Sequence, residues 1–203
     1  MGNGKLYVVS APSGAGKTSL LAEVRSELPS LKIAVSHTTR TIRPGEVDGE
    51  HYYFVNPKEF LTMVEQDDFI EHAEVFGNYY GTSKQAVNSL LDAGDSVVLE
   101  IDWQGAQQVR QIYPDAISIF ILPPSIGELE SRLNSRGQDS AEVISRRMDE
   151  AQSEISHFQE YEYLVINDDM AAAVNQLINI FSLPELFEPP SPEQLEKLFS
   201  SLK

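Results

Sequence analysis

The chain of 203 residues has no cysteine, and its 15 lysine and arginine residues are outnumbered by 31 acidic ones. Without cysteine it forms no disulfide and offers no thiolate metal ligand, which suits a reducing compartment, and we expect a cytoplasmic protein. The formal net charge of −16 argues against a nucleic-acid polymer as partner, because contacts with a phosphate backbone need an excess of positive charge. No apolar run is long enough to cross a membrane, and residues 1–5 contain no signal segment, so we expect no membrane partner.

The few basic residues are concentrated rather than evenly spread. An acidic protein that gathers its cations in one cleft still attracts a small anion. For any single arginine, pairing with a surface carboxylate is the alternative. Seven of the fifteen basic residues fall in three short segments, which contain Lys17, then Arg40 and Arg43, then Arg132, Arg136, Arg146 and Arg147.

Five short apolar runs rich in valine and isoleucine alternate with helical patterns. Such runs are typical of strands buried on both faces, and their alternation with helices favours a parallel sheet covered by helices, an α/β fold. The expected strands span 6–9, 32–35, 97–101, 117–122 and 164–166. The expected helices lie near 17–28, 104–113, 125–135, 140–157 and 171–181.

The interval from about 36 to 93 interrupts this alternation, and we interpret it as an inserted lobe. It contains β-like pieces at 51–55 and 74–80 and helical patterns at 57–66 and 83–92. The tail after Leu183 contains four prolines and then apolar residues at helical spacing, so we expect a stiff linker and a short amphipathic helix. That helix docks on its own core or on another subunit, and intramolecular packing is the preferred interpretation.

A glycine-rich loop lies between the first expected strand and the first expected helix. Its sequence, SAPSGAGKTS over residues 10–19, matches the pattern G-x-x-x-x-G-K-[ST] except at the first position, where Ala11 replaces glycine. In such a loop backbone N–H groups converge on a phosphate, a lysine bridges the outer phosphates and a hydroxyl group binds Mg²⁺. Lys17 and Thr18 are the candidates for the last two roles. A loop that is merely rich in glycine is the alternative.

The apolar run 97–101 is followed by carboxylates, because Glu100 lies near its end and Asp102 comes directly after it. Mg²⁺ keeps several waters and takes one or two carboxylates, so either residue is a candidate to hold the ion directly or through water. Acidic residues after a strand also commonly cap the next helix, and this alternative stays open.

Arg40 and Arg43 lie three residues apart in the segment SHTTRTIRPGE at 36–46, where the inserted lobe begins. A guanidinium group binds phosphate oxygens in a bidentate manner, so the pair suits the phosphate of a second substrate. Surface ion pairing is the alternative.

Together these and further segments resemble guanylate kinase, in that family's order and approximate spacing, over about residues 5–182. The resemblance rests on the phosphate loop and on SHTTRTIRPGE at 36–46, DGEHYYFV at 48–55, FIE at 69–71, GNYYGT at 77–82, EIDWQG at 100–105, RLNSRG at 132–137 and YLVINDD at 163–169. It implies transfer of the terminal phosphoryl group of ATP to GMP, and to dGMP, with ADP and GDP as products, in purine nucleotide metabolism.

The resemblance also implies a fold and a division of the chain. It predicts the three-layer fold of P-loop nucleoside triphosphate hydrolases, with a five-stranded parallel core sheet, an inserted GMP-binding lobe and a helical lid. The guanylate kinase-like domain is expected at 4–184, with its core at 4–35, 95–130 and 158–184, the lobe at 36–94 and the lid at 131–157. Residues 185–203 are expected to form a C-terminal extension.

The resemblance assigns the acceptor site residue by residue. The GMP phosphate is expected on Arg40, Arg43, Tyr52 and Tyr80, and the guanine on Ser36, Glu71 and Thr82, with Glu100 or Asp102 nearby. Gly81 is a further expected GMP-binding residue. The chemistry of guanine agrees, because its N1–H and 2-amino groups are adjacent donors that the Glu71 carboxylate accepts together. Adenine has an acceptor at N1 and no 2-amino group, so AMP would leave that carboxylate without partners. Without the family, Glu71 would be interpreted as a solvated carboxylate at a helix end.

The resemblance assigns the donor site in the same way. ATP is expected on Ala11, Pro12, Ser13, Gly14, Ala15, Gly16, Lys17, Thr18 and Ser19, on the lid arginines Arg132 and Arg136, and on Asn167 at the adenine. The candidate catalytic residues are Lys17, Arg40, Arg43, Arg136 and Arg147, and the candidate ligands of the Mg²⁺ that accompanies ATP are Thr18, Glu100 and Asp102. An ordinary surface arginine is the alternative for Arg132, and a strand-to-helix turn is the alternative for Asn167.

Phosphoryl transfer requires two nucleotides in line and neutralised charge, so no side-chain nucleophile is expected. We expect GMP to close the inserted lobe and ATP to close the lid, which excludes water. Two alternatives remain: a catalytically inactive guanylate-kinase-like protein-interaction module, and a kinase for another small phosphorylated acceptor. The sequence leaves the oligomeric state open, a homo-oligomer included.

Overall fold

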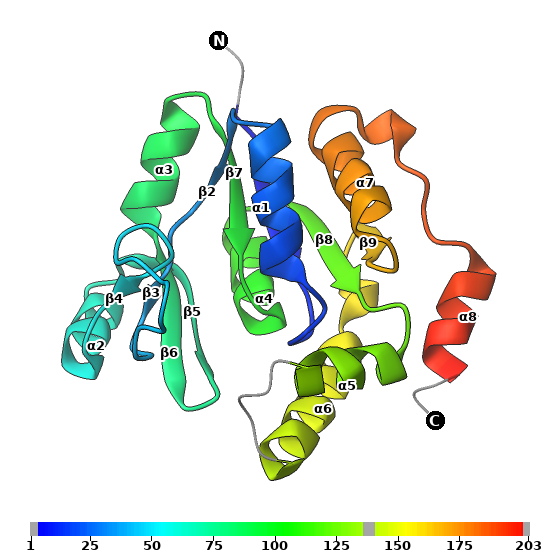
Figure 1. Cartoon of the computed structure of the whole chain (residues 1–203). Helices are drawn as coiled ribbons and strands as arrows, with labels where there is room; N and C mark the ends of the chain where they lie inside the picture. Colours follow the sequence, from blue (N-terminus) through cyan, green and yellow to red (C-terminus); the bar gives the residue numbers. More distant parts are fainter. Residues whose placement is uncertain (1–3, 136–140, 201–203) are drawn as a thin grey trace. The chain divides into compact units, whose positions relative to one another are not determined.

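The computed structural model describes residues 4–135 and 141–200, and these ranges contain two sheets and eight α-helices (Figure 1). The larger sheet has the order β2-β7-β1-β8-β9, and the pairs β2/β7 and β8/β9 are parallel. Its strands are β1 (Leu6–Ser10), β2 (Leu31–Ile33), β7 (Ser96–Glu100), β8 (Ile117–Leu122) and β9 (Tyr163–Ile166). The expected α/β fold with a five-stranded parallel sheet is confirmed.

The strands of this sheet are mostly apolar, as is typical of a parallel sheet that is covered on both faces. Val9 in β1, Val98 in β7 and Ile121 in β8 each have an exposure of 0%. Within the described ranges, no helix combines the length and the apolar character that a membrane span requires.

The chain divides into two compact units, and the first comprises Met1–Val8 and Ser30–Ile117. Besides β2 and β7 it contains a smaller sheet of order β4-β3-β6-β5, in which β5 and β6 are antiparallel. The strands of that sheet are β3 (His37–Thr38), β4 (Tyr53–Phe54), β5 (Phe69–Val75) and β6 (Asn78–Ser83). The helices of the unit are α2 (Pro57–Glu65), α3 (Lys84–Asp92) and α4 (Trp103–Ile112), of which α4 contacts β5 and α3 contacts β7.

Strands β5 and β6 form a hairpin where the sequence predicts a single β-like piece over 74–80, and that prediction is wrong. Phe76 and Gly77 form a two-residue turn with φ of 53° and 72°, and Val75 pairs with Asn78 across it. Positive φ at both positions is the type I′ geometry that suits the twist of a hairpin. The sequence conceals this turn because a phenylalanine rarely adopts positive φ.

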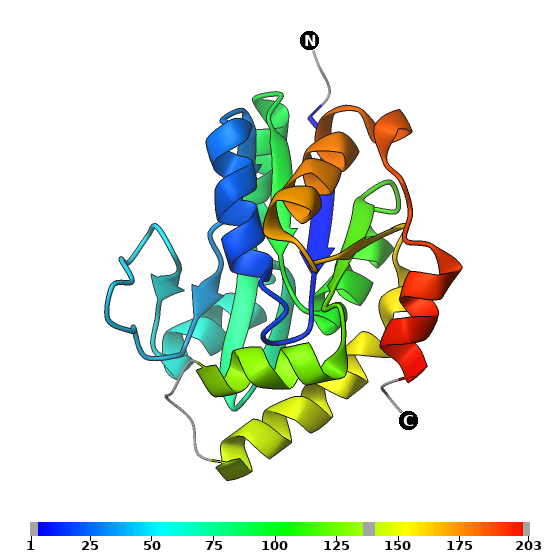
Figure 2. The same cartoon turned by 45° about the vertical axis from the view of Figure 1, so that its right-hand side comes forward.

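The second unit comprises Val9–Pro29 and Ser118–Lys203. Its helices α1 and α7 pack against each other, as Figure 2 shows in blue and orange. The unit contains α1 (Lys17–Glu27), α5 (Ile126–Ser135), α6 (Ala141–Ile155), α7 (Met170–Ser182) and α8 (Pro192–Ser200), with 3-10 turns at Phe158–Glu160 and Pro184–Leu186.

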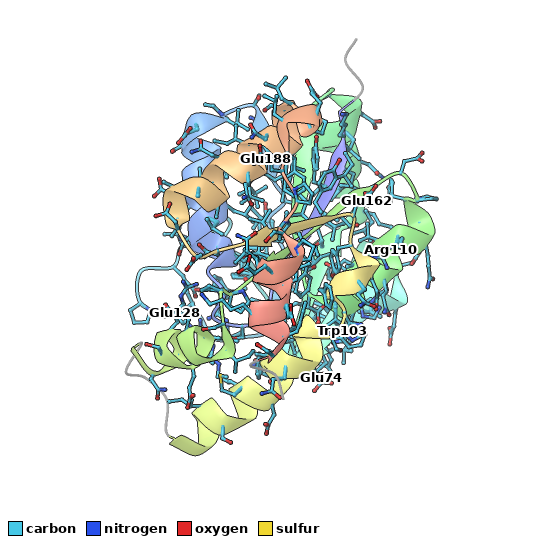
Figure 3. The ribbon with its side chains drawn as sticks, turned by 90° about the vertical axis from the view of Figure 1, so that its right-hand side faces the viewer. Glu74, Trp103, Arg110, Glu128, Glu162 and Glu188 are labelled. Carbon is cyan, nitrogen blue, oxygen red and sulfur yellow. The ribbon has the colours of Figure 1, made fainter. Side chains whose placement is uncertain are left out.

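The tail after Leu183 returns to its own unit, with α8 close to the segment that follows α6 (Figure 3). Leu198 has an exposure of 0%, and the ring of Phe199 stacks on that of Phe158 with centroids 4.6 Å apart. These contacts agree with the intramolecular packing preferred from the sequence.

We expect Leu198→Ala to lower the free energy of unfolding by about 2 to 5 kcal/mol, because it removes a buried side chain and leaves a cavity under α8. Urea denaturation followed by circular dichroism measures the change. Glu196→Ala, at an exposed position of the same helix, is the control and should leave the midpoint in place. Equal midpoints for both variants would show that α8 does not contribute to the core.

Candidate functional site

Three polar side chains form a buried chain of hydrogen bonds in the first unit. The exposures of Ser36, Glu71 and Thr82 are 9%, 3% and 0%. The Thr82 hydroxyl donates to Oε1 of Glu71 at 2.6 Å, and Oγ of Ser36 lies 2.9 Å from Oγ1 of Thr82. A threonine has one hydroxyl hydrogen, and Thr82 gives it to the carboxylate, so Ser36 donates to Thr82. The chain therefore fixes the position of the Glu71 carboxylate, the expected reader of guanine.

Neighbouring strands of the smaller sheet bring these residues together. Ser36 directly precedes β3, while Glu71 in β5 and Thr82 in β6 are cross-strand partners. The register shifts between Phe69 and Glu71, which indicates a β-bulge at the carboxylate. Gly81 has a packing role, because a Cβ there would lie 3.0 Å from ring atoms of Phe69.

Arg40 forms a bidentate ion pair with Glu46. Its two terminal nitrogens donate to the two carboxylate oxygens at 3.1 and 2.7 Å. The hydrogen bond from Arg40 lowers the pKa of Glu46; burial opposes this shift, and the backbone N–H of Arg43, at 2.8 Å, adds to it. For Arg40, burial by itself would lower the pKa. The hydrogen bond and the charge of Glu46 outweigh burial, so the pKa of Arg40 is raised. Ion pairing, the alternative from the sequence, is thus observed for Arg40.

Aromatic rings surround the Arg40 guanidinium. Its Cζ lies 5.4 Å from the centroid of Tyr52 and 5.8 Å from that of Phe54, and the rings of Tyr52 and Tyr80 are 6.0 Å apart. Burial, and then the charge of Glu100, raises the pKa of Tyr52 to about 12. Tyr52 therefore remains a neutral hydroxyl at physiological pH and can donate a hydrogen bond to an anion. Arg43, three residues after Arg40, is exposed.

Asp102, one of the two candidate metal ligands of this unit, is the N-cap of α4. Its Oδ1 accepts from the backbone N–H of Gly105 at 2.9 Å, and its Oδ2 accepts from Nε2 of Gln104 at 3.0 Å. The capping alternative is therefore observed for Asp102, whereas Glu100 ends β7 and is half-buried. Among the described residues, no three histidine or acidic side chains are grouped so as to hold a metal ion. A single carboxylate at the end of a strand, such as Glu100, is a donor of the kind that Mg²⁺ takes.

The glycine-rich loop lies in the second unit, between β1 and α1. Gly14 and Gly16 have φ of 94° and 93°, which residues with a side chain rarely adopt. Helix α1 begins at Lys17 with neither a capping side chain nor an acidic residue in its first turn. No residue of α1 itself therefore offsets its partial positive charge, an arrangement that suits a phosphate site. Lys17 is half-buried, while Thr18 and Ser19 are exposed.

Asn167 contacts the loop itself. Its amide Nδ2 donates to the carbonyl of Ala15 at 2.7 Å, and a Cβ on Gly16 would lie 2.6 Å from that nitrogen. Arg132 in turn donates to the carbonyl of Asn167 at 3.1 Å and to Glu128 at 2.9 Å. Glu128 is labelled on α5 in Figure 3. Asn167 and Arg132 thus belong to one network around the loop.

Helix α6 contacts the same loop through Ser13. Arg147 donates to the Ser13 hydroxyl at 2.8 Å, and the Ser13 backbone N–H donates to Glu154 at 2.9 Å. The sequence did not single out Glu154 or Glu46, because an acidic residue in a helix or turn is ordinary. Arg136 lies outside the described residues, as does the side chain of Arg146.

Comparison with known proteins gives the same result from sequence and from structure. A family model for guanylate kinase matches residues 3–183. Guanylate kinase of Hahella chejuensis (strain KCTC 2396) is 57% identical over 186 residues, 92% of this chain and 89% of the relative. That of Escherichia coli (strain K12) is 53% identical over 100% of this chain and 99% of its own. The crystal structure of guanylate kinase from Anaplasma phagocytophilum has a TM-score of 0.75 and 34% identity, covering 98% of this chain and 97% of that one.

The matched region includes both units. The glycine-rich loop, the arginine pair and the buried carboxylate all fall within residues 3–183. The Escherichia coli relative also covers the tail beyond residue 183. The chain therefore belongs to the guanylate kinase family, the ATP-dependent kinases that phosphorylate GMP.

Proposed function

We propose that each unit of this GMP kinase provides the residues for one nucleotide, the first unit for GMP and the second for ATP. The observation that carries the proposal is the buried chain from Ser36 through Thr82 to Glu71. The division into a core, a lobe at 36–94 and a lid at 131–157 stays a prediction, as does the cytoplasmic location, which the lack of cysteine supports.

The carboxylate of Glu71 reads the guanine. It accepts from N1–H and the 2-amino group, and Ser36 and Thr82 hold it in place for this purpose. AMP has neither of these two donors, so its binding would bury the carboxylate against the N1 lone pair of adenine. This recognition does not involve the sugar, and dGMP is a second acceptor.

The acceptor phosphate binds to the two arginines and the two tyrosines of the same unit. Arg40 exchanges its bidentate partner Glu46 for phosphate oxygens, or shares its donors between them. Arg43, Tyr52 and Tyr80 add donors around the same anion. Neutralising this phosphate helps one of its oxygens to approach the γ-phosphate as the attacking atom.

The loop at 11–19 and the arginines of the second unit bind ATP. Backbone N–H groups of the loop and Lys17 hold the phosphates, Arg132, Arg136 and Arg147 neutralise the transferring group, and Asn167 acts through the loop that it braces. When bound, Mg²⁺ neutralises charge on the phosphates of ATP. The candidate ligand of the second unit is Thr18, and those of the first are Glu100 and Asp102, of which Glu100 is preferred because Asp102 caps α4; each would act directly or through water.

A catalytically inactive interaction module and a kinase for another acceptor are the competing functions. The intact loop with Gly14, Gly16 and Lys17 argues against the first, because a module without catalysis has no need for it. The buried carboxylate argues against acceptors whose base lacks two adjacent donors.

A panel of acceptors tests the base reading. In an assay coupled to ADP release we expect turnover with GMP and dGMP and far less with AMP, UMP and CMP. Glu71→Gln should lower kcat/KM for GMP by at least about 100-fold, because the amide offers a donor where the base needs an acceptor. Glu74→Gln, at an exposed position of the same strand, should leave it unchanged. A better acceptor than GMP would overturn the proposed function.

Removing the lysine of the loop tests the ATP site. Lys17→Ala should reduce kcat about 100-fold or more, because the variant loses a charge aimed at the phosphates in the transition state. GMP binding measured by calorimetry should stay within twofold of the parent. Lys58→Ala, an exposed lysine of α2, is the control. Unchanged turnover in Lys17→Ala would exclude the loop from catalysis.

A further inference from the structure

Helix α4 packs on β5 directly behind the guanine-reading carboxylate. A Cβ built on Gly105 would lie 2.5 Å from Oε2 of Glu71 and 3.1 Å from its Cδ. No real Cβ approaches an oxygen so closely, so the carboxylate occupies the space that a side chain at position 105 would need. The Glu71 carboxylate can therefore occupy this place only if residue 105 of α4 has no side chain.

The backbone of α4 does not itself require glycine at this position. Gly105 has ordinary helical φ, unlike Gly14 or Gly16, and lies in the first turn of a regular helix. Glycine within a helix is less favourable than alanine, because its backbone loses more conformational freedom. Glycine at position 105 therefore lowers the stability of the helix. The close approach of the Glu71 carboxylate explains why a residue without a side chain is found there.

The carboxylate also has little freedom to move away from a larger residue. Glu71 has an exposure of 3%, and its Oε1 accepts the short hydrogen bond from Thr82. A methyl group at position 105 would therefore displace the carboxylate at the expense of that bond. The displacement would alter the recognition of the base before it altered the fold, because only the far end of one side chain has to shift.

Gln108, one turn further along α4, fixes the backbone beside the carboxylate. Its Oε1 accepts from the His72 N–H at 3.0 Å, and its Nε2 donates to the His72 carbonyl at 2.8 Å. Strand β5 is at the edge of its sheet, so this side chain pairs with the edge as another strand would. It does so at the residue that follows Glu71, and the register shift lies on the other side of Glu71, between Phe69 and Glu71.

We propose that Gly105 and Gln108 are positioning residues that set the selectivity of this enzyme for the 2-amino group of the base. Gly105 provides the space for the Glu71 carboxylate, and Gln108 holds the strand from which it projects. The inference rests on the proposed role of Glu71 as the guanine reader. It assigns to α4 a part in specificity although neither residue is proposed to touch the nucleotide.

The test compares GMP with IMP, which keeps N1–H and lacks the 2-amino group. We expect Gly105→Ala to raise KM for GMP at least tenfold and to reduce the ratio of kcat/KM for GMP over IMP by a similar factor. The KM for ATP should stay within twofold. Gly127→Ala is the matched control, because Gly127 also lies in the first turn of a helix and a Cβ there meets nothing within 4 Å.

Gln108→Glu provides a second, independent variant with almost the same shape. Its carboxylate cannot donate to the His72 carbonyl, so KM for GMP should rise and the GMP to IMP ratio should fall, with kcat changed less. Gln111→Glu, exposed on the same helix, is its control. Circular dichroism verifies folding, and if Gly105→Ala does not fold, Gln108→Glu decides the question.

The outcomes separate this inference from the function on which it rests. A parent enzyme that does not prefer GMP over IMP, or a Glu71→Gln variant that keeps this preference, would refute the reading by Glu71 itself. If Glu71→Gln loses the preference and folded Gly105→Ala and Gln108→Glu both retain it, the role of α4 is refuted while the proposed function stands.

Discussion

The structure of the first unit is organised around one buried carboxyl group, that of Glu71. A carboxylate with an exposure of 3% loses most of its hydration, and this loss is tolerated only where hydrogen-bond donors replace the water. Thr82 in β6 supplies such a donor, and Ser36, the residue before β3, donates in turn to Thr82. The bulge in β5, the hairpin partner β6 and the glycine in α4 are all arranged so that Glu71 reaches this position.

The second unit is organised around the conformation of its glycine-rich loop. Gly14 and Gly16 adopt positive φ, and the loop is held from outside by Asn167 on Ala15 and by α6 on Ser13. Backbone N–H groups bind a phosphate well only if they are oriented in advance, since ordering them at each turnover would cost free energy. Each unit has an acidic side chain on its proposed phosphate-binding segment: Glu46 bonds to Arg40, and Glu154 bonds to the backbone of Ser13.

Much of the fold was predictable because short apolar runs and helical periodicity report burial directly. The five parallel strands and the helices between them were expected close to their observed bounds, and a short helix was expected in the tail. The hairpin at 69–83 was not expected, because Phe76 occupies a turn position at which asparagine or glycine would have indicated a turn. The family motifs gave the candidate site residues. Glu46 and Gly105 lie within two of these motifs without a role assigned to them, and Glu154 and Gln108 carried no distinguishing local signal.

The sequence alone determined the fold class, the family and the chemical groups at hand, since these depend on periodicity and on motifs that are contiguous in the chain. Only the tertiary structure decided what each group contacts. In the folded chain Asp102 caps α4, Asn167 donates to the glycine-rich loop, and Gly105 leaves room for the Glu71 carboxylate. The reason is physical: burial, hydrogen-bond geometry and steric space arise between residues distant in sequence, and local patterns do not encode them.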